Sequence, residues 1–430
     1  MKFCAFNRLA TLLLALVFCL AGLSGCSSPH EGTSKTPGQD PNQQGNNENN
    51  KLVIMSIQAT TNHFDEYIDN ARAQTGLDIE VIAAPNNSYD RDAKFTTLLA
   101  SGDESVDIFT INDEMLNSYI VADFLEPLQE RVMTPDVVAM YPQEYVNMAV
   151  IQNEKVYTVP AWCDIYLYWV DQLVLNELQM QEPNNKAEFL SFVKAATKGS
   201  RFGYGDAWER NYIYSGLLQW ITMFGGDYFD WHNAKTVEAM QFLYDMAHTH
   251  KVTPMAQIAD QFDPMMQKAF DGVYASFFMF SGGISIIKDS GRYGEDQIHI
   301  AELPDFGNES TLIAAWHWIL SKSSVRKEAA YKFLKYAASK KGQMEYSLIM
   351  DTLCVNQEAI NDSEYKITGL EDVRWYINNT TLVARPYPTR SMEYVATVGS
   401  LFQKYISNEI NLDTFCNQMQ SQCDTYFERN

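Results

Sequence analysis

The sequence predicts an α/β protein built from two lobes. From residue 51 onward, short apolar runs alternate with helical segments, and this order is typical of a parallel sheet with right-handed crossovers. The roughly 380 residues that follow position 50 are more than one hydrophobic core holds. No linker-like break interrupts them, so we expect the chain to cross between the lobes more than once.

The first lobe begins with three apolar runs that we interpret as strands, at residues 52–57, 77–82 and 106–111. The segments between them have apolar residues at helical spacing. Asp65 is the expected N-cap of the first helix, and Gly76 is expected to end it. In such sheets, ligands bind at the loops that follow the carboxyl ends of the strands. Here those loops are residues 58–62, 85–89 and 112–114.

The later part of the chain is rich in aromatic side chains, which concentrate between residues 157 and 231. We expect further strands at residues 272–279 and 311–320. The second of these leads into a helix capped by Ser323 or Ser324. Other helices are expected near residues 234–248, 264–270 and 392–427.

The first 25 residues have the features of an export signal. Lys2 and Arg8 accompany an apolar run, residues 9–20, that is shorter than the ~20 residues a helix needs to cross a bilayer. The sequence Leu23-Ser24-Gly25-Cys26 follows and resembles the bacterial lipobox. This resemblance implies that Cys26 is lipidated and becomes the mature N-terminus. An ordinary secretory peptide is the alternative.

Residues 26–50 are expected to be the lipidated cysteine and a disordered tether. Residues 27–50 contain no aliphatic or aromatic side chain and have nothing to bury. Two of the 32 basic residues and none of the 54 acidic residues lie in residues 1–25, which leaves the mature chain a net charge of −24. Such a surface repels phosphate backbones and anionic headgroups, so we expect no nucleic-acid partner and no membrane contact beyond the anchor.

The histidine and cysteine spacings predict no metal site. None of the mature cysteines forms a CxxC pair. Cys416 and Cys423 share a helix face but lie about 10 Å apart on a helix, too far for a disulfide. On the helix expected around residue 248, the imidazoles of His248 and His250 diverge. We therefore predict neither a metal nor a cofactor.

Several short motifs occur in a shared order along residues 51–430. They are VDIF from Val106, LEPL from Leu125, VYTVP from Val156, FGGD from Phe224, the segment that ends at Gly283, AAWHW from Ala314 and RPYP from Arg385. In this order they resemble extracellular solute-binding proteins of the carbohydrate-uptake type, family 1, the group that includes maltose-binding protein.

The resemblance implies a two-lobe, periplasmic-binding-protein-like fold of type II. Two α/β lobes are joined by a hinge, and a carbohydrate is held in the inter-lobe cleft for delivery to the permease subunits of an ABC transporter. The first lobe would comprise residues 51–161 plus 312–356. The second would comprise residues 162–311 plus 357–430.

The chemistry of sugars indicates which residues line such a cleft. A sugar ring has apolar C–H faces and a rim of hydroxyls, so its site needs aromatic rings and planar hydrogen-bonding groups. The ligand-binding residues implied by the resemblance are Asn112, Asp113, Trp162, Asp164, Trp208, Glu209, Gly226, Asp227, Gly283, Trp316, Arg385 and Tyr387. At Gly283 the family often has an aromatic, so glycine there implies either a missing stacking ring or a close backbone approach. Core packing is the competing interpretation for each aromatic, and one of Trp316 and Trp318 is expected only to pack.

Three alternatives stay open. The first is an extracellular carbohydrate-active enzyme that uses two carboxylates, although the chain has no G-x-S-x-G elbow, phosphate loop or HExxH motif. The second is a binding protein for another solute, such as a polyamine or a peptide, and the third is a sugar sensor that feeds no transporter. Our prediction is a monomeric, non-catalytic solute-binding lipoprotein, anchored on the extracytoplasmic face of the cell membrane.

Overall fold

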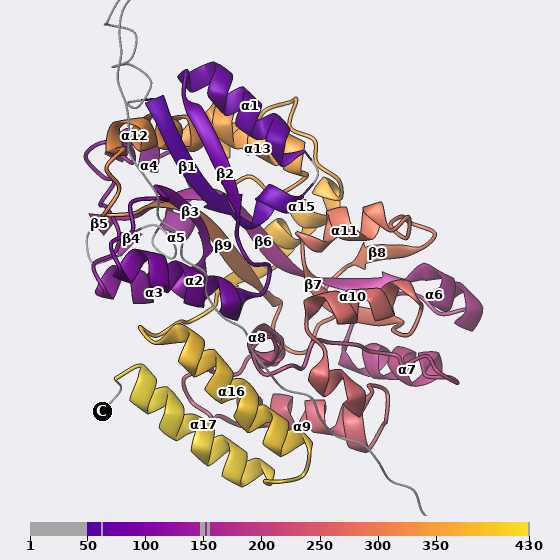
Figure 1. Cartoon of the computed structure of the whole chain (residues 1–430). Helices are drawn as coiled ribbons and strands as arrows, with labels where there is room; N and C mark the ends of the chain where they lie inside the picture. The colour runs from indigo at the N-terminus through magenta and orange to yellow at the C-terminus, as the bar shows by residue number, and fades with distance from the viewer. Residues whose placement is uncertain (1–49, 62, 147–150, 153–154, 429–430) are drawn as a thin grey trace, which may run out of the picture. The chain divides into compact units, whose positions relative to one another are not determined.

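A computed structural model describes residues 50–61, 63–146, 151–152 and 155–428. Its strands are β1 Lys51–Ser56, β2 Asp78–Ala83, β3 Ile108–Asn112, β4 Ile151–Gln152, β5 Lys155–Val156, β6 Thr158–Asp171, β7 Ser276–Phe280, β8 Ile298–Ala301, β9 Ser310–Leu320 and β10 Thr381–Ala384. They form an eight-stranded sheet in the order β2-β1-β3-β9-β6-β7, in which β10 pairs with β9 and β8 with β6 (Figure 1). β4 and β5 form a separate ribbon.

Helices lie between and beside these strands. They are α1 Phe64–Thr75, α2 Ser88–Ala100, α3 Asp113–Val121, α4 Pro135–Val138, α5 Gln143–Tyr145, α6 Gln172–Leu178, α7 Lys186–Ala196, α8 Ile213–Met223, α9 Ala234–His248, α10 Phe262–Phe270, α11 Gly283–Asp289, α12 Lys327–Ala338, α13 Lys340–Met350, α14 Gln357–Ile360, α15 Leu370–Asn379, α16 Ser391–Ile406 and α17 Leu412–Tyr426. Short 3-10 helices are η2 Ile57–Thr60 and η4 Met255–Ala259.

The first three strands confirm the predicted parallel order. β2 and β3 both pair with β1 in parallel, and β9 and β6 continue the sheet antiparallel. α1 ends at Gly76, as predicted, with a φ of 67° that glycine adopts without strain. The predicted cap at Asp65 is wrong. The N-cap is His63, and Asp65 lies in the first turn of the helix, where its charge meets the positive end of the helix dipole.

Two other predicted boundaries are wrong. α12 has Arg326 as its N-cap. The hydroxyl of Ser324 accepts from the N–H of Arg326 at 3.1 Å and donates to Asp107 at 2.6 Å, so it caps no N–H of the first turn. The strand expected from residue 272 begins only at Ser276, because Gly272, with a φ of 71°, terminates α10.

Helices cover both faces of the first part of the sheet (Figure 1). α1, α12 and α13 pack together on one face. There Trp318 of β9 meets Phe333 and Tyr346 edge-on, at 5.4 and 6.0 Å between ring centroids. α2 and α3 cover the other face, where Phe95 meets Phe109 at 4.9 Å. Trp318 is therefore the tryptophan of β9 that only packs.

β6 is a 14-residue strand whose residues are all buried. Its first half pairs with β9, and its second half pairs with β7 and β8. A β-bulge between Pro160 and Trp162 places Ala161 outside the regular pairing. β6 thus continues without a linker from the part of the sheet that pairs with β9 into the part that pairs with β7 and β8. The lobe boundaries, residues 51–161 plus 312–356 and residues 162–311 plus 357–430, stay a prediction.

Rings of the aromatic-dense segment form a core beside the second half of β6. Trp220 lies 5.5 Å from Tyr204 and 5.7 Å from Phe189, in edge-to-face contact with both. All three rings are fully buried. Phe242 and Phe306 pack on the same indole at 5.5 and 5.4 Å. These aromatics stabilise the fold by packing.

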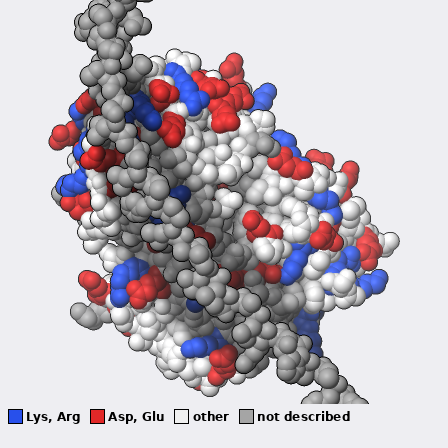
Figure 2. All heavy atoms as spheres, in the orientation of Figure 1, with Lys and Arg blue, Asp and Glu red and all other residues white. Residues whose placement is uncertain are grey.

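The predicted signal peptide, Cys26 and most of the tether lie outside the described residues. Within the described ranges, no helix is long and apolar enough to cross a membrane. Nor do those ranges contain a group of three or more His, Cys, Asp or Glu placed to hold a metal ion. Cys163, Cys354 and Cys416 are buried thiols outside any disulfide. On the face shown in Figure 2, acidic and basic side chains are interspersed.

Candidate functional site

Three of the predicted site residues lie in one row across the sheet. Asn112, the last residue of β3, pairs with Trp316 of β9, which in turn pairs with Trp162 of β6. Residues directly opposite each other in antiparallel strands point to the same face. The bulge at Ala161 brings Trp162 into this row. The row lies at the carboxyl end of β3, where ligands of α/β sheets bind.

The two indoles of this row stack with a third ring and a guanidinium. The ring centroids of Trp162 and Trp316 are 4.6 Å apart, with 12° between the ring planes. Tyr346 of α13 stacks on Trp162 at 5.6 Å. Arg91 of α2 lies over the ring of Trp316, 5.4 Å from its centroid, which is a cation–π distance. Trp162 is buried, whereas Trp316 keeps partial exposure.

Asp164 is a buried carboxylate two residues beyond Trp162. The indole N–H of Trp162 donates to Oδ2 at 3.2 Å, and the hydroxyl of Ser281 donates to Oδ1 at 3.1 Å. A Cβ on Gly282 would lie 3.0 Å from Oδ1, so glycine lets the backbone approach the carboxylate. Burial raises the pKa of Asp164, and hydrogen bonds from Ser281, Gly282 and Trp162 oppose that rise without cancelling it.

Arg385 connects the segment after β10 to α3. Its guanidinium forms an ion pair with Asp113 and donates to the hydroxyl of Ser215 at 3.1 Å. It also lies over the rings of Phe280 and Tyr387, at 5.1 and 5.2 Å. Burial acts to lower the pKa of Arg385, but the surrounding negative groups, Asp113 first, raise it above its ordinary value. The guanidinium therefore remains charged.

Further hydrogen bonds link α3 to the segment that follows Arg385. The amide of Asn117 donates to the carbonyl of Tyr387 at 2.7 Å, and the hydroxyl of Ser118 donates to the carbonyl of Thr389 at 2.6 Å. Segments predicted to belong to different lobes therefore meet here.

Several buried or half-buried polar atoms in this region have no hydrogen-bond partner among the described residues. They are Arg91 Nε, Asn112 Oδ1, Glu114 Oε1, Asn211 Oδ1 and Arg385 Nε. Glu114 interacts electrostatically with Arg91, with Arg385 and with Tyr212, the neighbour of Asn211. Buried polar groups in proteins are nearly always paired with protein, water or ligand. The set offers both donors and acceptors to a ligand. We call Arg91, Asn112, Asp113, Glu114, Trp162, Asp164, Trp316 and Arg385 the junction cluster.

Other predicted residues lie outside the junction cluster. Trp208 is fully buried, edge-on to Phe402 at 5.3 Å. A Cβ on Gly226 would lie 2.7 Å from Oγ1 of Thr236, and the N–H of Asp227 donates to the same oxygen at 3.0 Å. This loop therefore holds the start of α9.

Gly283, Glu209 and Tyr387 lie next to groups of the site. Gly283 begins α11 and packs against Met279, so the glycine that approaches the carboxylate is its neighbour. Glu209 accepts the side-chain amide of Asn211 at 3.2 Å and thereby orients its Oδ1. Tyr387 is buried beneath the guanidinium of Arg385.

Four candidate residues were missed by sequence reasoning: Arg91, Glu114, Asn211 and Ser281. The strand-end loops pointed toward two of them, because Glu114 closes the loop 112–114 and Arg91 lies two residues after the loop 85–89. Asn211 and Ser281 carry no signal in the sequence, since each is placed by contacts with another segment.

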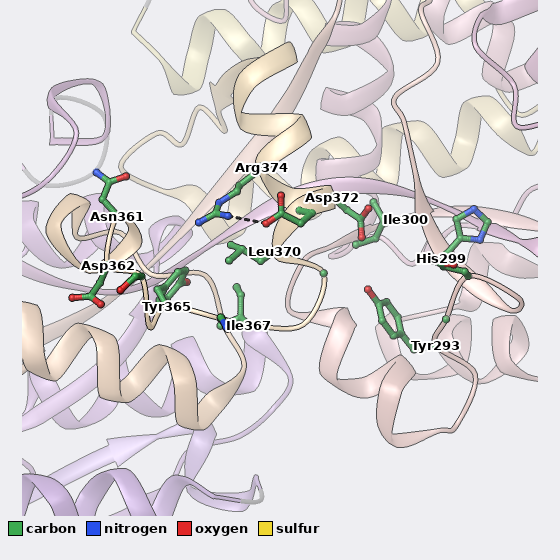
Figure 3. A pocket seen from close by; sticks show the side chains of 16 residues that line it. Tyr293, His299, Ile300, Asn361, Asp362, Tyr365, Ile367, Leu370, Asp372 and Arg374 are labelled. Carbon is green, nitrogen blue, oxygen red and sulfur yellow. Dashed lines mark hydrogen bonds and ion pairs between the residues drawn. The ribbon is translucent and has the colours of Figure 1, made fainter.

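A separate cavity of about 820 Å³ lies beside β8 (Figure 3). Side chains from residues 293–300 and 361–374 line it. Ile300 and Leu370 contribute apolar surface, and the ion pair of Arg374 with Glu371 lies at its edge at 2.7 Å. None of the predicted site residues lines this cavity.

Solved structures with the same fold support the two-lobe assignment. Maltose-bound MalE3 of T. maritima matches with a TM-score of 0.75 at 18% identity, over 87% of this chain and 99% of that chain. A Thermotoga lettingae solute-binding protein bound with alpha-D-tagatose gives 0.77 at 16% identity, over 88% and 99%. UgpB of Mycobacterium tuberculosis, in complex with glycerophosphocholine, gives 0.75 at 16% identity, over 88% and 98%. These likenesses confirm the predicted fold class.

The family follows from the sequence comparison. The family model described as bacterial extracellular solute-binding protein matches residues 58–344, which is more than half of the chain. The protein therefore belongs to the bacterial extracellular solute-binding protein family. Both its family and its fold are those of solute-binding proteins rather than enzymes.

Proposed function

We propose that this protein captures a carbohydrate at the junction cluster and delivers it to the permease of an ABC importer. The observation that carries this proposal is the set of unpartnered polar atoms beside the stacked indoles, at the carboxyl end of β3. A hydroxyl both donates and accepts, so a sugar's hydroxyl rim satisfies arginine donors and amide or carboxylate acceptors together.

The position of the cluster supports capture by closure. Arg385 follows β10 and contacts Asp113 at the start of α3, so the cluster joins segments that we assign to opposite lobes. A solute bound there would contact both lobes and favour the closed form by its differential affinity. The similar structures named with maltose and tagatose are consistent with a sugar in this fold.

The remaining parts of the proposal concern attachment. We propose that Cys26 is lipidated after export, that residues 27–50 tether a monomeric globule to the extracytoplasmic face, and that the mature surface avoids nucleic acid. Radiolabelled palmitate incorporated by the wild-type chain and lost in Cys26→Ala would support the anchor. Equal labelling of both chains would contradict it.

Binding is tested by calorimetry on the mature exported chain carrying Cys26→Ala. Mono- and oligosaccharides, polyamines and peptides are titrated, and each sugar is recovered and checked for cleavage. Asp164→Ala should weaken sugar binding at least tenfold, because it removes a carboxylate that accepts from the indole of Trp162, while the urea midpoint shows a folded protein. If only a polyamine or a peptide binds, the proposed carbohydrate is wrong and the solute is of that other class. If the recovered sugar is cleaved, the protein is an enzyme.

A further inference from the structure

The aromatic faces at the junction cluster are already covered. Trp162 stacks on one face of Trp316, and the guanidinium of Arg91 lies over the same ring at 5.4 Å. The indole and the guanidinium thus both take up part of the surface of this ring. Arg385 covers Phe280 in the same way. A solute at this site therefore meets cationic groups where neutral sugars usually meet open rings.

Arg91 is a buried cation without a carboxylate partner. The residue is 2% exposed. Its Nη1 donates to the carbonyls of Pro85 and Asn86 at 3.1 and 2.8 Å, and its Nε has no hydrogen-bond partner in the described part of the chain. Among the described residues, no acidic group lies within ion-pair distance of this guanidinium, whereas Arg385 is paired with Asp113.

A buried charge without a partner is costly, so its environment has to supply compensation. Around Arg91 this compensation is incomplete. Burial lowers the pKa of Arg91, and Glu114, the largest opposing influence, does not restore the ordinary value. The surroundings of Arg385 do raise its pKa. The two guanidiniums of the junction cluster thus differ: Arg385 has a carboxylate partner, and Arg91 lacks one among the described residues.

We propose that Arg91 determines specificity, and that the solute is a carbohydrate bearing one carboxylate, of the uronic acid class. This rests on the proposed function. The carboxylate accepts from the planar guanidinium, a geometry that arginine favours. The sugar hydroxyls then meet Oδ1 of Asn112 and Oε1 of Glu114, two buried oxygens that have no hydrogen-bond partner in the described part of the chain. Asp113, Glu114 and Asp164 also face this region, and their negative charges disfavour a doubly charged phosphate.

The experiment compares ligands that differ only in charge. Galacturonate, glucuronate and their short oligomers are titrated by calorimetry against the neutral parent sugars, the uronate methyl esters and glucose 6-phosphate. The wild-type protein should bind the preferred uronate at least tenfold more tightly than its methyl ester. In Arg91→Gln, the same ratio should fall below about threefold. Arg131→Gln, at an exposed arginine paired with Glu328, is the matched control and should keep the full ratio.

The outcomes separate the two proposals. A neutral sugar or methyl ester that binds as tightly as the uronate overturns the uronate assignment and leaves carbohydrate capture standing. An Arg91-dependent preference for glucose 6-phosphate overturns it in favour of a phosphorylated sugar. If no carbohydrate binds, the proposed function fails as well. The comparison of the uronate with its methyl ester uses only the wild-type protein, so it tests the uronate assignment even if Arg91→Gln does not fold.

Discussion

Aromatic side chains occupy two contrasting environments in this protein. Beside the second half of β6, Trp220 is surrounded by other rings in edge-to-face contact and is fully buried. In the junction cluster, Trp316 contacts both Trp162 and the guanidinium of Arg91 and keeps partial exposure.

The difference separates packing from recognition. Fully buried rings that contact other rings present no surface to a solute, and their number reflects the size of the core. Trp316 instead lies beside charged groups whose hydrogen-bonding atoms lack partners among the described residues, and this is where we propose that a solute binds. Aromatic content alone does not distinguish the two, whereas the partners of each ring do.

The largest effect is expected from truncating a ring of the aromatic core. Trp220→Ala should lower the free energy of unfolding by roughly 3–5 kcal/mol, because it removes a large buried side chain and leaves a cavity. Trp316→Ala should cost less stability, about 1–2 kcal/mol, because the side chain is only partly buried, while it weakens solute binding more. Urea unfolding and calorimetry measure both quantities. If Trp220→Ala and Trp316→Ala lost equal stability and bound the solute equally well, the distinction between a packing ring and a solute-binding ring would be wrong.

A somewhat smaller effect is expected at the buried ion pair. Asp113→Ala leaves the guanidinium of Arg385 without its carboxylate, and broken buried pairs cost about 3 kcal/mol. The double variant Asp113→Ala/Arg385→Met should recover part of this loss, because it leaves no unpaired charge. Urea unfolding of the two variants beside the wild type gives the comparison. A double variant less stable than Asp113→Ala would contradict the explanation.

The smallest effect concerns a carboxylate inside the aromatic core. Burial raises the pKa of Asp206 to about 7, against hydrogen bonds from the N–H of Ala207 and the hydroxyl of Tyr204. The folded state thus holds this proton more tightly than the unfolded chain. The stabilising contribution is complete below the unfolded pKa near 4 and is lost as the pH rises through 7.

Between pH 5 and pH 8, the wild-type protein should therefore lose roughly 2 kcal/mol of stability that Asp206→Asn does not lose. Urea midpoints of both proteins across this range provide the measurement. Glu328→Gln changes an exposed carboxylate and serves as the control, with the wild-type slope expected. Parallel pH profiles for Asp206→Asn and the wild type would show that Asp206 does not titrate in this range.

Much of the fold was predictable because it follows from local patterns. Apolar runs located β1, β2 and β3 to within two residues, and Gly76 marked the end of α1. The caps at Asp65, Ser323 and Ser324 were predicted wrongly. A capping residue type shows only that the residue is able to cap. The hydroxyl of Ser324 instead donates to Asp107, more than 200 residues earlier in the chain, and accepts from Arg326, the residue before α12.

The candidate site was predictable only in part, because the pairing register of β3, β9 and β6 brings its members together, and the sequence does not show that register. Trp162 and Trp208 look alike in the sequence, since each has an acidic residue within two positions. One pairs with Trp316 across the sheet and the other packs against Phe402 in the core. Arg91 was missed because what distinguishes it is the lack of a charged partner, which only three-dimensional contacts reveal.

The extra residue in β6 has a consequence for how this chain tolerates change over evolution. Ala161 is an extra residue, and it shifts the alternation of the side chains along the strand by one step. Trp162 and Asp164 therefore point to the same face as Val159, whereas unbroken alternation would point them to the opposite face. Deleting Ala161 would remove the bulge and leave Trp162 opposite Trp316 in an unbroken ladder, so the indole and the carboxylate would keep their face of the sheet. A one-residue gap at this position in an alignment would thus mark a relative that lacks the bulge and still presents the same side chains on this face.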